Sequence, residues 1–287
     1  MHYPPTELVL NNKGQVYHLG LDANNIGDKI ILVGDQNRVD MVASYFESTE
    51  HESQHREFVC KTGFYNGKRI TALSTGIGTD NIDIVVNELD ALANIDVEKR
   101  EDKENITSLD IVRIGTCGIL QAEIPVHSFI LSSHAFGLDN VAHFYEIAET
   151  KEEKELNAAI NSHIDLPSEI ITYLRKASPK MISKLISDKT FQGITVTSSG
   201  FFGPQGRHLR LKSKTGHLND QLTSFRYADN KILNFEMESS ALFALGTALG
   251  HNCGTICLGI GNRPKREYTD GYKPHMLKLI QYVLDRI

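Results

Sequence analysis

The sequence lacks an excess of positive charge and any long apolar run. It has 30 lysines and arginines against 36 acidic residues, a formal net charge of -6, which disfavours a surface for nucleic acid or another polyanion. Any anion that it binds should therefore be small. No stretch approaches the ~20 apolar residues that span a bilayer, and residues 1–7 have no cationic start. We expect a cytoplasmic chain without nucleic-acid or membrane partners.

Cysteine is also scarce, and its spacing is uninformative for metal binding. The four cysteines are Cys60, Cys117, Cys253 and Cys257, and none forms a Cys-x-x-Cys pair. Their neighbours are apolar, which is typical of buried free thiols in a reducing compartment. We expect neither disulfides nor a metal site.

Internal repeats and low-complexity linkers are absent too, so we expect one domain over residues 1–287. Short β-rich apolar runs alternate with helical patterns. The predicted strands are 29–33, 69–74, 110–114, 128–132, 193–198 and 255–260. The predicted helices are one capped by Asp80, one over 239–249 closed by Gly250, and one beginning near Pro274. This alternation predicts a mostly parallel or mixed twisted sheet between two layers of helices, a three-layer α/β/α fold.

Two charged stretches, 97–105 and 146–154, are predicted to be solvated surface loops or frayed helices.

One arginine lies within an apolar run, where its charge would need a bound or neighbouring anion. Arg113 interrupts the apolar run 111–114, and the glycine-rich turn 115–118 follows it. A buried guanidinium destabilises the fold unless it is paired, and glycines let a ligand approach the backbone. The upstream run 29–33 leads in the same way to Gly34 and Arg38. Because ligands of such sheets lie at the carboxyl ends of strands, both arginines are candidates for one anion site.

Three more segments, 74–78, 198–207 and 234–239, complete a recognisable order of motifs. Together with the two arginine strands they resemble the nucleoside phosphorylase family, most closely its uridine phosphorylases. The resemblance runs from residues 16–21 to 259–263. It implies the α/β/α fold and a pentosyltransferase of nucleoside salvage, in which phosphate attacks C1′ of uridine and releases uracil and ribose 1-phosphate.

The resemblance also assigns the phosphate and ribose sites. It implies phosphate binding by Gly34, Arg38, Arg113 and Thr116, together with Arg56 of a neighbouring subunit. It implies ribose binding by Met237 and Glu238, with His18 of the neighbouring subunit at the 5′-hydroxyl. Planar guanidinium groups suit phosphate, and a carboxylate suits vicinal hydroxyls. Shared sites imply a homo-oligomer built on a dimer.

For the base, the resemblance implies Phe201, Gln205, Arg207 and Arg263. A carboxamide matches the adjacent carbonyl and N3–H of uracil, and an arginine stabilises the charge on the departing base. Phe201 would stack on the ring. Arg113, Glu238 and Arg207 are thus the expected catalytic residues. Purine-specific members carry an aspartate near the position of Asn262, so the sequence favours a pyrimidine.

Several alternatives stay open at this point. The same fold could serve a purine nucleoside phosphorylase, a nucleoside hydrolase or a non-catalytic nucleoside sensor. Gly261 replaces a bulky apolar residue of the family and leaves room for thymine. No cofactor is expected besides the co-substrate phosphate. Some relatives hold a monovalent cation through the glutamate matching Glu57 and a serine that is Asn81 here.

Overall fold

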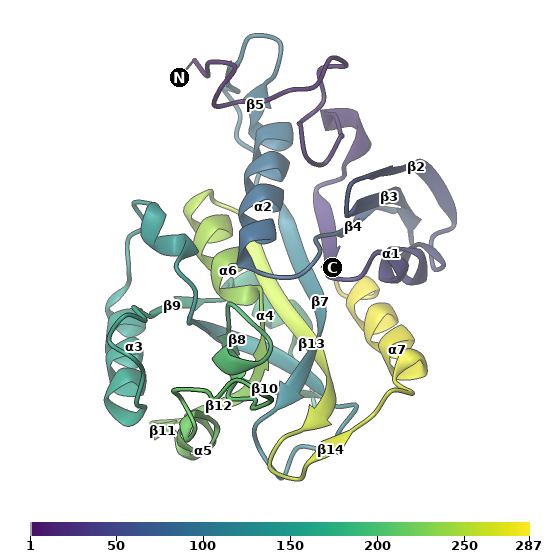
Figure 1. Ribbon diagram of the computed structural model, residues 1–287. Helices are drawn as coiled ribbons and strands as arrows, with labels where there is room; N and C mark the ends of the chain where they lie inside the picture. The colour runs from purple at the N-terminus through teal and green to yellow at the C-terminus, as the bar shows by residue number, and fades with distance from the viewer. Residues whose placement is uncertain (1) are drawn as a thin grey trace.

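The computed structural model describes residues 2–287, and a twelve-stranded mixed sheet runs through them (Figure 1). The helices are α1 (Gln36–Ala43), α2 (Thr79–Asn94), α3 (Lys151–His163), α4 (Pro179–Leu185), α5 (Leu218–Ser224), α6 (Ser239–Ala248) and α7 (Lys273–Leu284). The strands of the large sheet are β1 (Lys29–Val33), β2 (Ser48–His55), β3 (Phe58–Tyr65), β4 (Lys68–Ser74), β7 (Asp110–Ile119), β8 (Phe129–Gly137), β9 (Tyr173–Lys176), β10 (Thr190–Thr197), β11 (Arg226–Tyr227), β12 (Asn230–Glu236), β13 (Asn252–Asn262) and β14 (Glu267–Tyr268).

Strand pairing closes part of this sheet on itself. β1 pairs in parallel with β4 and β7, and β7 pairs in parallel with β13. β8, β10 and β12 form a second parallel group, which β13 joins antiparallel through β8. The end of β12 then returns to pair with the end of β7. Five strands therefore form a ring, and the carboxyl ends of β7 and β12 meet.

Helices cover both faces of the sheet, as the alternation of β1 shows. Ile30 and Leu32 pack into the core beneath α2 and α6, whereas Ile31 and Val33 pack into the core beneath α1 and α7. Figure 1 shows α2 beside α6 and α1 beside α7. The predicted mixed sheet between helical layers is confirmed.

The predicted strands are all present, although most are longer than expected. β1 has the predicted bounds, and β7 and β13 extend well beyond theirs. The hairpin β2–β3 was not predicted, because β2 is almost wholly polar and gives no apolar alternation. The α2 prediction was wrong in one detail: Gly78, with φ of 100°, occupies the N-cap position, and Asp80 lies in the first turn.

The two charged stretches are more ordered than predicted. Residues 97–105 contain β6 (Glu101–Asp102), which pairs with β5 (Ile95–Asp96). The guanidinium of Arg100 donates hydrogen bonds to the backbone oxygens of Tyr3 and Leu8, so this stretch holds the N-terminal segment in place. Residues 146–154 include the start of α3, where buried Glu153 completes a capping box with Thr150.

Within residues 2–287, no helix combines the length and the apolar character needed to cross a membrane.

The capping box of α3 gives a direct test of its contribution to stability. The Thr150 hydroxyl accepts a hydrogen bond from the Glu153 N–H at 3.2 Å, and the Glu153 carboxylate accepts from the Thr150 N–H at 2.8 Å. Thr150→Ala should lower the free energy of unfolding by about 1 kcal/mol in urea denaturation. Ser162→Ala, in the exposed last turn of the same helix, is the control. Equal effects of the two changes would contradict a capping role.

Candidate active site

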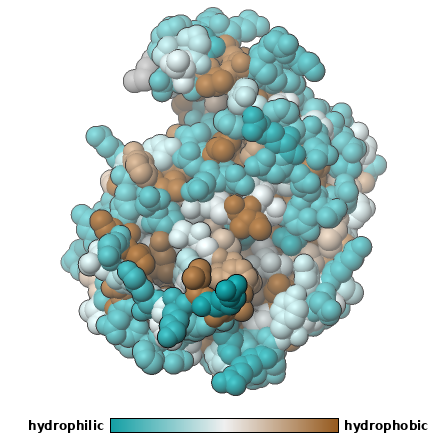
Figure 2. Space-filling model, viewed as in Figure 1, coloured by the Kyte–Doolittle hydropathy of each residue, from teal (hydrophilic) through white to brown (hydrophobic). Residues whose placement is uncertain are grey.

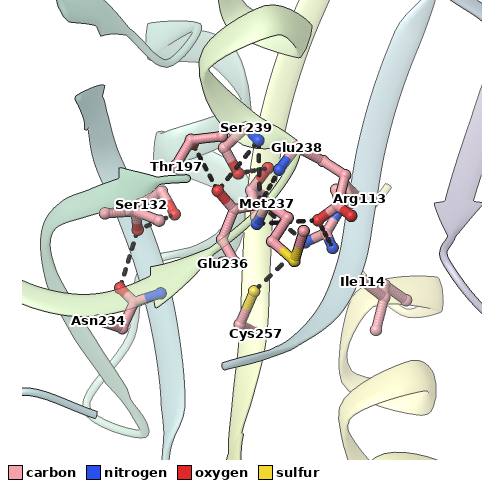
Figure 3. Close-up of polar contacts among 12 residues, drawn as sticks. Arg113, Ile114, Ser132, Thr197, Asn234, Glu236, Met237, Glu238, Ser239 and Cys257 are labelled. Carbon is pink, nitrogen blue, oxygen red and sulfur yellow. Dashed lines mark hydrogen bonds and ion pairs between the residues drawn. The ribbon is translucent and has the colours of Figure 1, made fainter. Parts of the chain in front are cut away.

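Arg113 points toward the layer formed by α2 and α6. It shares the face of β7 with Ile111, which belongs to the core beneath these two helices. The guanidinium there reaches two carboxylates (Figure 3): one nitrogen lies 3.2 Å from Glu236, and the other contacts Glu238 directly. All three side chains are buried. The anion predicted for Arg113 is therefore supplied, in this structure, by the protein itself.

Two buried carboxylates share the one guanidinium of Arg113. Burial alone would lower the pKa of Arg113, but Glu238 and Glu236 outweigh it and raise the pKa above its ordinary value. Burial raises the pKa of Glu236, and Arg113 offsets only part of that effect. Arg113 is thus a permanent cation. Its Nε–H is buried without a hydrogen-bond partner among residues 2–287, so one donor stays available.

Gly115 makes this position of Arg113 sterically accessible. A Cβ at residue 115 would lie 2.2 Å from Nη1 of Arg113 and 2.8 Å from Sγ of Cys257. The guanidinium therefore lies over the bare backbone of Gly115. The sequence shows this glycine but not its role, because the direction of the arginine side chain is not visible in a linear pattern.

Glu236 was missed as a functional residue. Its carboxylate accepts hydrogen bonds from the Thr197 hydroxyl at 2.6 Å and from the backbone N–H groups of Glu238 and Ser239, each at 2.9 Å. It thereby satisfies free donors at the start of α6. Glu238 itself is the N-cap residue of α6 and accepts from the Gly78 N–H at 2.9 Å. The predicted position of Glu238 ahead of this helix is correct.

The other predicted phosphate residues lie at the carboxyl ends of β1 and β7. Arg38 is buried and donates to the Ile114 carbonyl at 3.3 Å. Burial lowers its pKa, and the neighbouring charge of Arg113 adds to this effect. Gly34 lies close to the Gly76 carbonyl, which would be 3.3 Å from a Cβ at residue 34. Thr116 is half-buried just beyond Gly115.

The predicted base residues form a second group. The Oε1 atom of Gln205 accepts hydrogen bonds from Arg207 and from Arg263, the latter at 3.0 Å. The Arg207 guanidinium lies 3.6 Å from the ring centroid of Phe201. Burial lowers the pKa of Arg207, and burial together with the charge of Arg207 lowers the pKa of Arg263 to about 10.

A cavity of about 640 Å³ opens beside this group, with Phe201, Arg207 and Arg263 in its wall. Gly118 and Gly261, which are paired residues of β7 and β13, line it as well. The ends of the two strands thus contribute no side chain at this point. The cavity therefore has space beyond the arginines, in agreement with the room expected from Gly261.

Ser198 connects the two groups and was also missed. Nε2 of Gln205 donates to the Ser198 hydroxyl at 2.8 Å, and the Ser198 N–H donates to the Glu236 carbonyl at 3.0 Å. Ser198 therefore fixes the position of Gln205 relative to Glu236, one of the two carboxylates that contact Arg113. Half-buried Met237 lies between these two carboxylates in the sequence (Figure 3).

The structure places His18 and Arg56 together in a third group, separate from Arg113. Nδ1 of His18 lies 2.7 Å from the Glu88 carboxylate, which also accepts from the backbone N–H groups of His18 and Leu19. Arg56 lies 5.5 Å from the ring centroid of Tyr17. Among residues 2–287, no hydrogen bond or ion pair joins this third group to Arg113 or Glu238.

Glu57 and Asn81 both lie against Gly76. A Cβ at residue 76 would be 3.6 Å from Cγ of Glu57 and 2.5 Å from Nδ2 of Asn81. A carboxylate and a carboxamide are thus adjacent, and both are oxygen-donor types that suit a hard cation. The resemblance gave this pair only as the counterpart of a cation site in some relatives, and the expectation of no cofactor stays a prediction.

Comparison with known proteins identifies the family. A family model described as the phosphorylase superfamily matches residues 28–274. The chain belongs to this superfamily. It is 30% identical over 254 residues to the uridine phosphorylase of Haemophilus influenzae, with 88% of each chain covered. It is 27% identical to a DeoD-type purine nucleoside phosphorylase of Oceanobacillus iheyensis, covering 83% of this chain and 84% of that one.

Solved structures agree with this assignment. A Trypanosoma brucei nucleoside phosphorylase with uridine phosphorylase activity superposes with a TM-score of 0.88 and 27% identity, covering 98% of this chain and 99% of that one. The predicted nucleoside phosphorylase relationship is confirmed, and this phosphorylase is an enzyme of the pentosyltransferase class that carries out phosphorolysis of nucleosides.

Asn262 lies near the position at which the resemblance places an aspartate in purine-specific members. Its amide group donates to the carbonyls of Gln121 at 3.0 Å and Ile124 at 2.9 Å, and its oxygen accepts from the Lys265 N–H at 3.0 Å. The side chain is buried and fully used by backbone partners. It therefore fixes the end of β13.

Asn262→Asp tests this role. A carboxylate at residue 262 would face two carbonyl oxygens that lose their donors, so the free energy of unfolding should fall by about 1–3 kcal/mol. Urea denaturation measures that change, and an inosine assay checks for purine cleavage. An unchanged stability together with new inosine activity would show that the side chain faces the substrate.

Proposed function

We propose that this phosphorylase acts on pyrimidine nucleosides, with uridine as its substrate. The observation that carries the proposal is the Gln205 carboxamide, whose oxygen is held by two arginines at the edge of a cavity. A carboxamide offers a donor and an acceptor side by side. Uracil presents a carbonyl next to N3–H and therefore matches both, whereas cytosine lacks the N3–H.

Binding of uracil requires an exchange of hydrogen bonds at Gln205. Both lone pairs of Oε1 are used by Arg207 and Arg263, while Nε2 has one hydrogen beyond the one given to Ser198. We infer that Arg207 turns from Oε1 to the O4 atom of the base, which frees Oε1 for N3–H. The same arginine then stabilises negative charge on the base as N1 departs.

The phosphate and ribose roles follow from the Arg113 group. The free Nε–H of Arg113 and the guanidinium of Arg38 supply donors for phosphate at the ends of β7 and β1. The Glu238 carboxylate accepts hydrogen bonds from the ribose hydroxyls and favours the positive charge that develops on the sugar ring. Arg113 contacts this carboxylate directly and orients it.

Product analysis tests the reaction and the base preference. Purified protein is incubated with uridine, thymidine or inosine, each with and without phosphate. We expect uracil and ribose 1-phosphate from uridine only when phosphate is present, cleavage of thymidine because Gly261 leaves room for the methyl group, and no hypoxanthine from inosine.

Each other outcome would indicate a different activity for this protein. Undiminished uracil release without phosphate would indicate a hydrolase, and faster cleavage of inosine would indicate a purine enzyme. Tight nucleoside binding without turnover would indicate a sensor.

We further propose a homo-oligomer built on a dimer, in which His18 and Arg56 complete the site of the neighbouring subunit. Gly78 contacts Glu238 at the start of α2, whereas Glu88, the partner of His18, lies ten residues farther along. At 1.5 Å per residue this places Glu88 about 15 Å from Gly78. His18 is therefore too distant for the ribose beside its own Glu238.

Subunit mixing tests this arrangement. Glu238→Ala and Arg56→Ala should each inactivate the dimer, but a co-expressed mixture should recover about one quarter of the normal activity, because half the dimers are hybrids with one intact site. The control is Glu238→Ala mixed with Gln205→Ala, which affect the same subunit's site and leave no intact one. Equal recovery in both mixtures, or none in either, would contradict sharing.

A further inference from the structure

A second cavity, of about 700 Å³, lies next to the base cavity and shares only Arg207 with it. Its wall includes the buried side chains of Leu138 and Leu218 and the segment 209–215. None of the residues assigned to phosphate or ribose lines it. The roles proposed for phosphate and ribose binding therefore do not explain this cavity.

The outer wall of this cavity exposes leucine to solvent. Leu209 is 76% exposed and Leu211 is 88% exposed, although most leucines of the chain are buried. Phe202, 52% exposed, lies on the same cavity. The face in Figure 2 is mostly polar with apolar patches at several places, and some of these lie in the lower part of the view, where Figure 1 places β10, β12 and α5. An apolar occupant would remove these side chains from water.

The same wall is strongly basic. Arg210 and Lys212 alternate with Leu209 and Leu211, Lys214 follows two residues later, and all three cations are exposed. The sequence contains no aspartate or glutamate from residue 189 to 219, in a chain whose net charge is -6. None of the three cations forms an ion pair within residues 2–287. They are therefore free to pair with an anion from outside.

We propose that this cavity binds a monomeric amphiphilic carboxylate, with its hydrocarbon body against the leucines and its carboxylate at Arg210, Lys212 and Lys214. The cavity volume falls within the ~300–1,000 Å³ that is usual for small-molecule sites. Apolar lining with a few cations at the rim matches a ligand that is apolar along its length and anionic at one end. A concave site of this size fits a single molecule better than a membrane surface.

Isothermal titration calorimetry of the full chain with dodecanoate tests the proposal below the concentration at which the probe forms micelles. We expect saturable one-to-one binding, and roughly tenfold weaker binding of the uncharged dodecyl maltoside. The double variants Leu209→Ser/Leu211→Ser and Arg210→Glu/Lys212→Glu should each weaken dodecanoate binding by roughly tenfold. None of these four residues belongs to the proposed catalytic machinery.

The matched control is Ile106→Ser/Lys151→Glu, which alters an exposed apolar residue and an exposed lysine elsewhere and should leave the affinity unchanged. Equal affinity for the charged and uncharged probes, no effect of the cavity variants, or binding only to anionic vesicles would each overturn the proposal. Because calorimetry does not use turnover, failure of this proposal and failure of the uridine assignment are separate results.

Discussion

The buried contact of Arg113 with Glu236 and Glu238 is the interaction on which the candidate active site depends. It joins β7 to the end of β12 and the start of α6, two consecutive elements that are distant from β7, since Glu238 lies 125 residues from Arg113. Removing one partner of such a buried group leaves an uncompensated charge and typically costs about 3–5 kcal/mol. The neighbouring features serve this contact: Gly115 makes space for the guanidinium, and Gly78 and Ser239 donate to the carboxylates.

The fold depends on residues throughout the chain, whereas the proposed choice of base depends on only a few side chains. Relatives named for uridine and for purine nucleosides have similar identity to this chain, so overall similarity does not separate the two substrates. The proposed preference for uridine rests in part on the residue at the end of β13. Asn262 faces the backbone, and this leaves Gln205 and its two arginines as the polar groups assigned to the base.

Much of the fold could be predicted from the sequence, because apolar alternation marks the buried strands and the helical stripes. The need of Arg113 for an anion could also be predicted, since a charge within an apolar strand is costly. Its partners could not be identified in this way, because Glu238 is 125 residues away and only the closure of the sheet brings it near. The prediction that Asp80 caps α2 was wrong because Gly78, a glycine with positive φ, occupies the N-cap position without a capping side chain.

The helix α2 carries two functional contacts on one rigid element. Its first turn begins at Gly78, which donates to Glu238, and its middle holds Glu88, which orients His18. A displacement of the helix along its axis therefore moves both contacts together. In the proposed dimer, such a displacement would change the Glu238 contact in one sugar site and the position of the His18 that serves the other.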